Sequence, residues 1–310
     1  MAKAKFILYL FLLILINFKS YTAENVYIVY KVNNEIITNS DIEKEYRYLV
    51  SLNNELKNLE KKKIIKLSKE SALREKIKKI ELSKYFDLKE INVNIDNYLE
   101  NFYRNLNIVD KNEFEEYLED NDISLEYIQK KIEIEILWNQ LIYDRYFSQV
   151  NINRSEIKEK VKKLISTNKQ KKYSLSEILF DKENNSNFDK KLIDINESIR
   201  EIGFNNTANI YSISDSAKFG GKVGWIEEQK LSTKVLEQLK VLEIGQYTSP
   251  IQAGSSFLIL KIEEIKYENA IINEEEELNK MVQFDTNEQL GQFSKIFYRK
   301  IKINSFIDEL

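Results

Sequence analysis

The residue types of this chain limit the chemistry that it can perform. Its 310 residues include no cysteine and no histidine. That composition excludes disulfides, thiolate nucleophiles, imidazole acid–base catalysis and metal sites built from Cys or His. Carboxylates, hydroxyl groups, lysines and the backbone remain, and we expect neither a metal nor a cofactor.

Two patterns that could bind ions have simpler explanations. The loop Phe219–Trp225 contains three glycines, but it is not followed by a helix start with Lys or Ser/Thr, as a phosphate cradle requires. We interpret these glycines as backbone positions with positive φ. The acidic run Glu274–Glu277 is interpreted as a solvated linker and not as a metal site. The sequence shows no nucleotide-binding motif, so we expect no nucleotide.

Charge and composition describe a globular chain of two unlike parts. The 47 basic residues are matched by 50 acidic ones, which gives a net charge of −3. Because no basic patch emerges, we expect no nucleic-acid partner. With 43% hydrophobic residues the chain is long enough for two domains. Six of the seven glycines and Pro250 fall between residues 203 and 254, which marks a separate second part.

The first residues have the pattern of an export signal. Lys3 and Lys5 precede Phe6–Phe18, a run of 13 uncharged residues that is short for a membrane-spanning helix. We predict a signal peptide over residues 1–23, with cleavage after Ala23. An uncleaved membrane anchor is the alternative, because Tyr21 fits a small-residue cleavage site badly. An acidic exported chain without cysteine suits a bacterial periplasm.

Residues 24–170 are predicted to form a helical module. It starts with two short strands around Asn33-Asn34, and a capping box Ser40–Glu43 then leads into the first helix. Apolar residues at helical spacing mark several further helices up to about residue 165. Residues 24–202 contain neither proline nor glycine, as expected for helices joined by short polar loops.

A different domain is predicted over residues 171–267. A strand pattern up to Phe180 is followed by a helical stripe that Gly203 closes. The glycine loop, a helix from about Ser232, and strands before and after Gly254 complete an α+β unit. Residues 268–310 then provide a linker and an amphipathic C-terminal helix. That helix has too little apolar surface to fold alone and must dock on the helical module.

Residues 172–266 resemble a parvulin, or PpiC-type rotamase, domain. The resemblance is carried by LSEILF, FGGKVGW, EIGQYTSPI and GSSFLILKI, in the order and spacing of that family. The segments VYKVNNEIITNSDIEKE, LREKIKKIELSKYFDLKEINV and SFIDEL resemble the terminal parts of SurA-type periplasmic chaperones. The implied fold class is α+β. A helical N-terminal module is completed by a C-terminal helix, with one inserted parvulin-like domain of a four-stranded antiparallel sheet plus helices.

The resemblance also implies site residues, and two of them depart from the family. The positions of the two parvulin histidines are occupied here by Glu177 and Leu258. The Cys or Asp that faces the proline carbonyl corresponds to Ser214, or to Asp215 if the gap is placed differently. Ser255 retains the hydroxyl of the last family position.

The proline pocket implied by the resemblance is apolar but lacks its aromatic wall. The family's Met and Phe correspond to Leu231 and Val235, and Val223, Phe257 and Leu258 complete the predicted peptide- and proline-binding residues. Without the histidines, we expect isomerisation to be weak or absent.

Three functions follow from the resemblance and the composition. The first is an ATP-independent periplasmic holdase that binds unfolded, aromatic-rich outer-membrane proteins, with the outer-membrane assembly machinery as a possible further partner. The alternative is an active peptidyl-prolyl cis–trans isomerase that assists the folding of exported proteins. The third is a structural envelope protein that has kept the fold and lost both activities.

Overall fold

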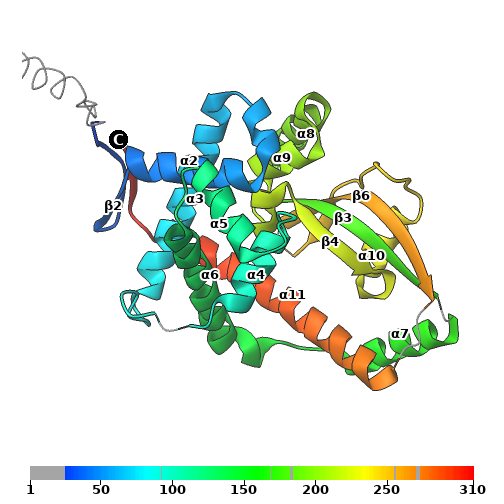
Figure 1. Ribbon diagram of the computed structural model, residues 1–310. Coiled ribbons are helices and arrows are strands. Elements are labelled where there is room, and N and C mark those ends of the chain that lie inside the picture. The colour runs from blue at the N-terminus through cyan, green and yellow to red at the C-terminus, as the bar shows by residue number, and fades with distance from the viewer. Residues whose placement is uncertain (1–24, 92, 168, 182–183, 255, 270–272) are drawn as a thin grey trace, which may run out of the picture.

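The structure is a computed structural model that combines a helical part with a part built around an antiparallel sheet (Figure 1). It describes residues 25–91, 93–167, 169–181, 184–254, 256–269 and 273–310. The predicted signal peptide, residues 1–23, lies outside this range. No helix among the described residues combines the length and the apolar character needed to cross a membrane.

The helical part begins with the strands β1 (Ile28–Val32) and β2 (Glu35–Thr38), joined at Asn33 with φ 53°. The helices of this part are α2 (Asn39–Leu52), η1 (Asn54–Asn58), α3 (Lys61–Leu82), α4 (Asp96–Arg104), α5 (Lys111–Asp120), α6 (Leu125–Tyr146), η2 (Phe147–Gln149) and α7 (Arg154–Thr167). The hairpin and the helical character match the sequence prediction.

The predicted capping box is misplaced by two residues. Thr38 caps α2: its side chain accepts a hydrogen bond from the Asp41 amide at 3.3 Å, and the Asp41 carboxylate accepts one from the Thr38 amide at 2.8 Å. The prediction from Ser40 and Glu43 was therefore wrong in register. Because β2 runs directly into the helix, the last strand residue supplies the cap.

The sheet part follows in chain order and is antiparallel throughout. Its elements are β3 (Lys169–Asp181), α8 (Asn184–Ile202), α9 (Phe204–Tyr211), η3 (Asp215–Phe219), β4 (Lys222–Glu227), η4 (Glu228–Lys230), α10 (Thr233–Leu239), β5 (Ile251–Ala253) and β6 (Ser256–Asn269). The strand order is β4-β3-β6-β5. Helix α9 was not predicted, because Gly203, with φ 83°, was interpreted only as the end of α8.

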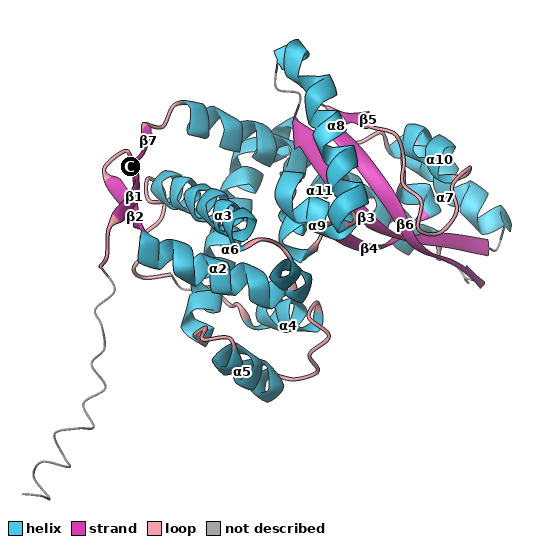
Figure 2. Ribbon diagram, turned by 90° about the horizontal axis from the view of Figure 1, so that it is seen from above, coloured by secondary structure: helices cyan, strands magenta, loops and turns pink. Residues whose placement is uncertain are grey.

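The chain then returns to the helical part through α11 (Glu274–Ile303) and β7 (Ile307–Glu309). Strand β7 pairs antiparallel with β1, so the first and last strands of the described residues share the sheet β2-β1-β7 (Figure 2). The acidic run Glu274–Glu277 is the first turn of α11, which corrects its interpretation as a linker. Carboxylates are favourable there, because they face the positive end of the helix dipole.

Helix α11 packs on α3, α6 and α7. Phe297 is buried and stacks on Trp138 of α6 with ring centroids 5.6 Å apart. The indole N–H of Trp138 donates to the Ser294 hydroxyl at 2.8 Å. The predicted fold class is therefore confirmed: a helical part completed by the C-terminal helix, with an inserted four-stranded antiparallel sheet.

Replacing Phe297 by Ala is expected to destabilise the protein by about 3–5 kcal/mol, because it leaves a cavity against Trp138. The control is Ile303→Ala at the end of the same helix, where the side chain is 84% exposed; we expect its effect to stay within about 0.5 kcal/mol. Urea unfolding followed by circular dichroism measures both. Equal effects of the two substitutions would contradict the docking of α11.

Candidate functional site

Glu177 lies at the centre of a small hydroxyl–carboxylate cluster. One of its carboxylate oxygens, Oε1, accepts a hydrogen bond from the Ser214 hydroxyl at 2.5 Å and another from the Ser216 hydroxyl at 2.8 Å. Ser214 is buried, with 8% of its surface exposed. The structure thus brings together two of the sequence-predicted residues, Glu177 and Ser214. It adds Ser216, which sequence comparison did not indicate.

The backbone around Glu177 fixes this cluster. The Glu177 amide donates to the Gly221 carbonyl at 2.7 Å, and the Ile213 amide donates to the Leu179 carbonyl at 2.7 Å. At Gly221, φ is 77° and an added Cβ would lie 2.3 Å from the Glu177 carbonyl oxygen. Only glycine permits this approach. The glycine loop therefore has the structural role predicted for it: it holds β3 against the chain that carries Ser214.

Leu231, Val235 and Leu258 share one apolar cluster on the α10 face of the sheet. Leu231 and Val235 are each 8% exposed, so this face offers a packed apolar wall. Leu258 lies on β6 opposite Leu179 of β3. In the parvulin family, which this domain resembles, a histidine occupies this position. The leucine side chain has no group that can form a hydrogen bond there.

Phe257 is separated from this wall. It packs on the other face of the sheet, against Phe188 with ring centroids 4.5 Å apart and against Phe180 at 6.0 Å. Neighbouring residues of a strand point to opposite faces, so Phe257 and Leu258 do not line one pocket. Val223 lies on the outer strand β4 and is 40% exposed. Ser255 lies outside the described residues.

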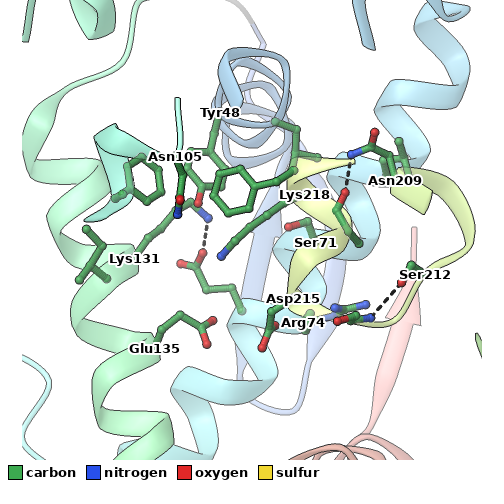
Figure 3. Close-up of a pocket in the computed structure, with 18 of the residues that line it drawn as sticks. Tyr48, Ser71, Arg74, Asn105, Lys131, Glu135, Asn209, Ser212, Asp215 and Lys218 are labelled. Carbon is green, nitrogen blue, oxygen red and sulfur yellow. Dashed lines mark hydrogen bonds and ion pairs between the residues drawn. The ribbon is translucent and has the colours of Figure 1, made fainter. Parts of the chain in front are cut away.

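Asp215 lines a cavity of about 300 Å³ between the sheet part and the helical part, which Ser214 also lines. Asp215 and Lys218 of η3 lie across this cavity from Lys131 and Glu135 of α6 (Figure 3). Burial opposes ionisation of Asp215, but Lys78, Lys218 and other cations outweigh it and hold the pKa of this carboxyl below its usual range. Asp215 therefore stays charged at neutral pH.

A buried ion-pair cluster forms the helical wall of the cavity. The Lys131 ammonium contacts Glu75 and lies 2.6 Å from Glu45, which also accepts from the Tyr127 hydroxyl at 2.8 Å. Burial alone would raise the pKa of Glu75, but Lys131 and Lys79 lower it to about 2. No local sequence pattern indicates this cluster, because its members come from α2, α3 and α6 and each has the spacing of an ordinary charged residue on a helix surface.

A second, larger cavity of about 1220 Å³ lies between α3 and α11 on one side and α8 and α9 on the other. Its lining is mixed in charge and includes several tyrosines. The basic lining residues of α3 and α11 include Lys63, Lys66, Arg74, Lys295 and Lys302, and the acidic ones of α8 are Asp194, Glu197 and Glu201. Within the described ranges, no cluster of three or more acidic side chains has the geometry of a metal site.

Specific contacts join the two parts around these cavities, and Ile202, Ile210 and Phe219 pack against the apolar core of the helical part. The side-chain amide of Asn53 donates to the Asn209 side chain at 2.8 Å, and the rings of Phe102 and Phe219 lie 6.1 Å apart. At the other end, Arg299 of α11 forms an ion pair with Asp181 at the end of β3. These contacts hold the sheet part beside the helical part and leave space between them.

Comparison with known proteins identifies the sheet part. A family model described as Rotamase, PPIC-type PPIASE domain, matches residues 164–264. Chaperone SurA of Pseudomonas putida is 24% identical over 160 residues, which cover 49% of this chain and 38% of that protein. Chaperone SurA of Photorhabdus laumondii is 37% identical over 71 residues, 23% of this chain and 16% of that protein. The chain thus matches well under half the length of these relatives.

Two solved structures are similar at low identity. One of the two SurA-like chaperones PEB4 and Cj1289 of Campylobacter jejuni is 17% identical with a TM-score of 0.32, covering 91% of this chain and 98% of that one. PrsA from Bacillus subtilis is 16% identical with a TM-score of 0.29, covering 89% and 91%. From the sequence matches, the chain carries a PpiC-type peptidyl-prolyl isomerase domain and has SurA chaperones as distant relatives.

Replacing Lys131 by Met is expected to cost about 3–5 kcal/mol at pH 7, because it leaves Glu45 buried without its cation and Glu75 with Lys79 alone. In the natural protein the pKa of Glu75 is lowered to about 2. Its contribution to stability is therefore complete above the ordinary glutamate pKa and is lost as the pH falls toward 2. Without Lys131 the pKa of Glu75 rises, so acid unfolding should begin at a higher pH.

The control for this substitution is Lys130→Met, whose side chain is 63% exposed and pairs with Glu126 on the surface of α6. Acid titration of the fluorescence or circular dichroism of both variants measures the shift. An unchanged acid midpoint in Lys131→Met would contradict the assigned role of the cluster.

Proposed function

We propose that this chain, a PpiC-type domain set into a framework with SurA relatives, is an ATP-independent periplasmic holdase for unfolded outer-membrane proteins. The observation that carries the proposal is the cavity of about 1220 Å³ between the helical part and the PpiC-type domain. Its volume exceeds that of most small-molecule sites, which are roughly 300–1,000 Å³. A space of this size suits a stretch of polypeptide.

The lining of this cavity supports loose binding of extended chains. Tyr98, Tyr143 and Tyr211 provide aromatic surface, and Asn139 and Asn287 provide amide donors and acceptors. Aromatic rings contact apolar side chains of many shapes, and amides pair with any exposed backbone. Such a surface binds polypeptides with little dependence on their sequence, as a holdase with many clients requires.

The site chemistry supports weak or absent isomerase activity in the PpiC-type domain. Rotation about an X-Pro bond has a barrier of about 18–20 kcal/mol, and catalysis requires groups that favour the twisted amide over the planar one. Leu258 offers no such group, and the hydroxyl protons of Ser214 and Ser216 are already donated to Glu177. The apolar wall of Leu231 and Val235 remains suited to contact a proline ring.

One observation favours the alternative, an active isomerase for exported proteins. The carboxylate of Glu177 with its two hydroxyl donors forms a polar cluster in the position that the family resemblance assigns to catalysis. A substrate carbonyl that displaced Glu177 as the acceptor of the Ser214 hydroxyl would receive a hydrogen bond there. This alternative requires measurable acceleration of isomerisation.

The holdase proposal is tested with a urea-unfolded porin diluted into buffer without ATP. Equimolar protein should suppress light scattering by the porin. Because the chain has no cysteine, a photo-crosslinker can be placed at Asn287→Cys in the large cavity. It should capture the porin, whereas the same label at Val109→Cys, a 70% exposed site of the helical part, should not.

The outcomes distinguish the holdase function from the location of the client site. Undiminished scattering would overturn the holdase function. Suppressed scattering with equal capture at both positions would instead remove the cavity as the client site.

A further inference from the structure

We propose that the outer edge of β4 binds an extended segment of an unfolded client, which adds to the PpiC-type sheet as a fifth strand. The inference rests on the proposed holdase function and names a binding surface and a binding mode for it. The surface consists of Lys222–Glu227, with Val223 and Trp225 as its exposed apolar side chains.

Strand β4 has one free edge. It is the outer strand of the order β4-β3-β6-β5, as both ribbon views show (Figures 1 and 2). Within the part of the chain that the structure describes, its only strand partner is β3, and no other backbone hydrogen bond involves Lys222–Glu227. The outward N–H and C=O groups of such an edge form a template for another strand.

The other outer strands of the described residues are poorer templates. Strands β5 and β7 have three residues each, and β2 has four, against six in β4. Strand β7 also carries Asp308 and Glu309. Short and charged edges discourage pairing with further chains. By length, β4 is therefore the outer strand that offers the longest edge for strand addition.

The side chains of β4 add an apolar surface to this free backbone. Trp225 is 48% exposed and Val223 is 40% exposed. Ile226, in contrast, packs into the cluster that contains Leu231. Between the two exposed residues, Gly224 has φ 88°, and a Cβ built there meets no atom within 4 Å. The edge thus combines open space at its centre with an exposed indole beside it.

The register fixes how much of the edge is usable. Gly224, Trp225, Ile226 and Glu227 pair regularly with Leu175, Ser174, Tyr173 and Lys172. A bulge follows, because the register shifts between Leu175 and Ser176, and Val223 is the extra residue. The regular stretch is therefore short, and we expect it to hold a client segment weakly and reversibly, as a holdase requires.

The occupant is defined by the chemistry of this edge. It must be extended, must offer unpaired backbone groups and must place apolar side chains at every second position, one of which contacts Trp225. Unfolded segments of transmembrane β-barrels have this alternation. A helical or a proline-rich segment would not satisfy the β4 amides.

Hydrogen exchange with mass spectrometry tests the proposal on the full chain. The probe is a ten-residue peptide of alternating Val and Thr with blocked ends, and the control is the same peptide N-methylated at every residue, so that neither of its edges can donate hydrogen bonds. We expect the unmethylated peptide to slow exchange at the outward amides of residues 222–227 at least tenfold. The methylated peptide should leave their exchange unchanged, because it cannot complete the ladder.

A pair of exposed substitutions tests the side-chain contribution. Trp225→Ser should weaken peptide binding at least fivefold. Ile193→Ser, at a 55% exposed position of α8, should leave it unchanged. Both side chains lie on the surface, so the fold should tolerate both changes.

The results distinguish this inference from the function on which it rests. If the chain protects the porin but the peptide fails to bind, or binds without slowing exchange in residues 222–227, strand addition at β4 is wrong and the holdase function stands. Equal effects of the methylated and unmethylated peptides also overturn it. If the porin itself is not protected, the proposed function fails first.

Discussion

The return of the C-terminal helix to the N-terminal helices is the constraint on which the rest of the structure depends. Helix α11 packs through Phe297 on Trp138 of α6, and the strand after it pairs with β1. On the same helix, Arg299 forms an ion pair with Asp181 at the end of β3. One helix thus closes the helical part and also fixes the PpiC-type domain beside it. The same helix lines the larger of the two cavities between these parts.

Within the PpiC-type domain, the apolar residues suited to binding are kept, whereas the family's two histidines are replaced. The apolar wall of Leu231 and Val235 is retained, but a leucine stands at position 258, and one carboxylate oxygen of Glu177 accepts the hydrogen bonds of two serine hydroxyls. We therefore propose that this site contacts a proline side chain and offers little to a twisted amide. We thus propose three places for polypeptide contact: the large cavity, the apolar wall of Leu231 and Val235, and the edge of β4.

Local patterns in the sequence predicted most of the fold. The helical spacing of apolar residues, the Asn33 turn and the glycine loop could each be predicted from a short stretch of sequence. The family motifs predicted the sheet and named Glu177 and Ser214, which the structure brings into contact. Features that depend on distant elements were missed or misplaced. The Lys131 cluster unites three helices, and the cap of α2 shifted to Thr38 because β2 precedes it directly. Phe257 was grouped with Leu258 by nearness in sequence, although strand alternation places them on opposite faces.

The central claim is that the PpiC-type domain contacts proline without catalysing its isomerisation efficiently. Exchange NMR of a short X-Pro peptide, with the natural protein at high concentration, tests it most directly, and a Glu177→His, Leu258→His double variant serves as comparison. The account predicts contact shifts in the peptide with no acceleration of cis–trans exchange by the natural protein. Acceleration by the natural protein would contradict the account and would make the chain an isomerase that works without histidine.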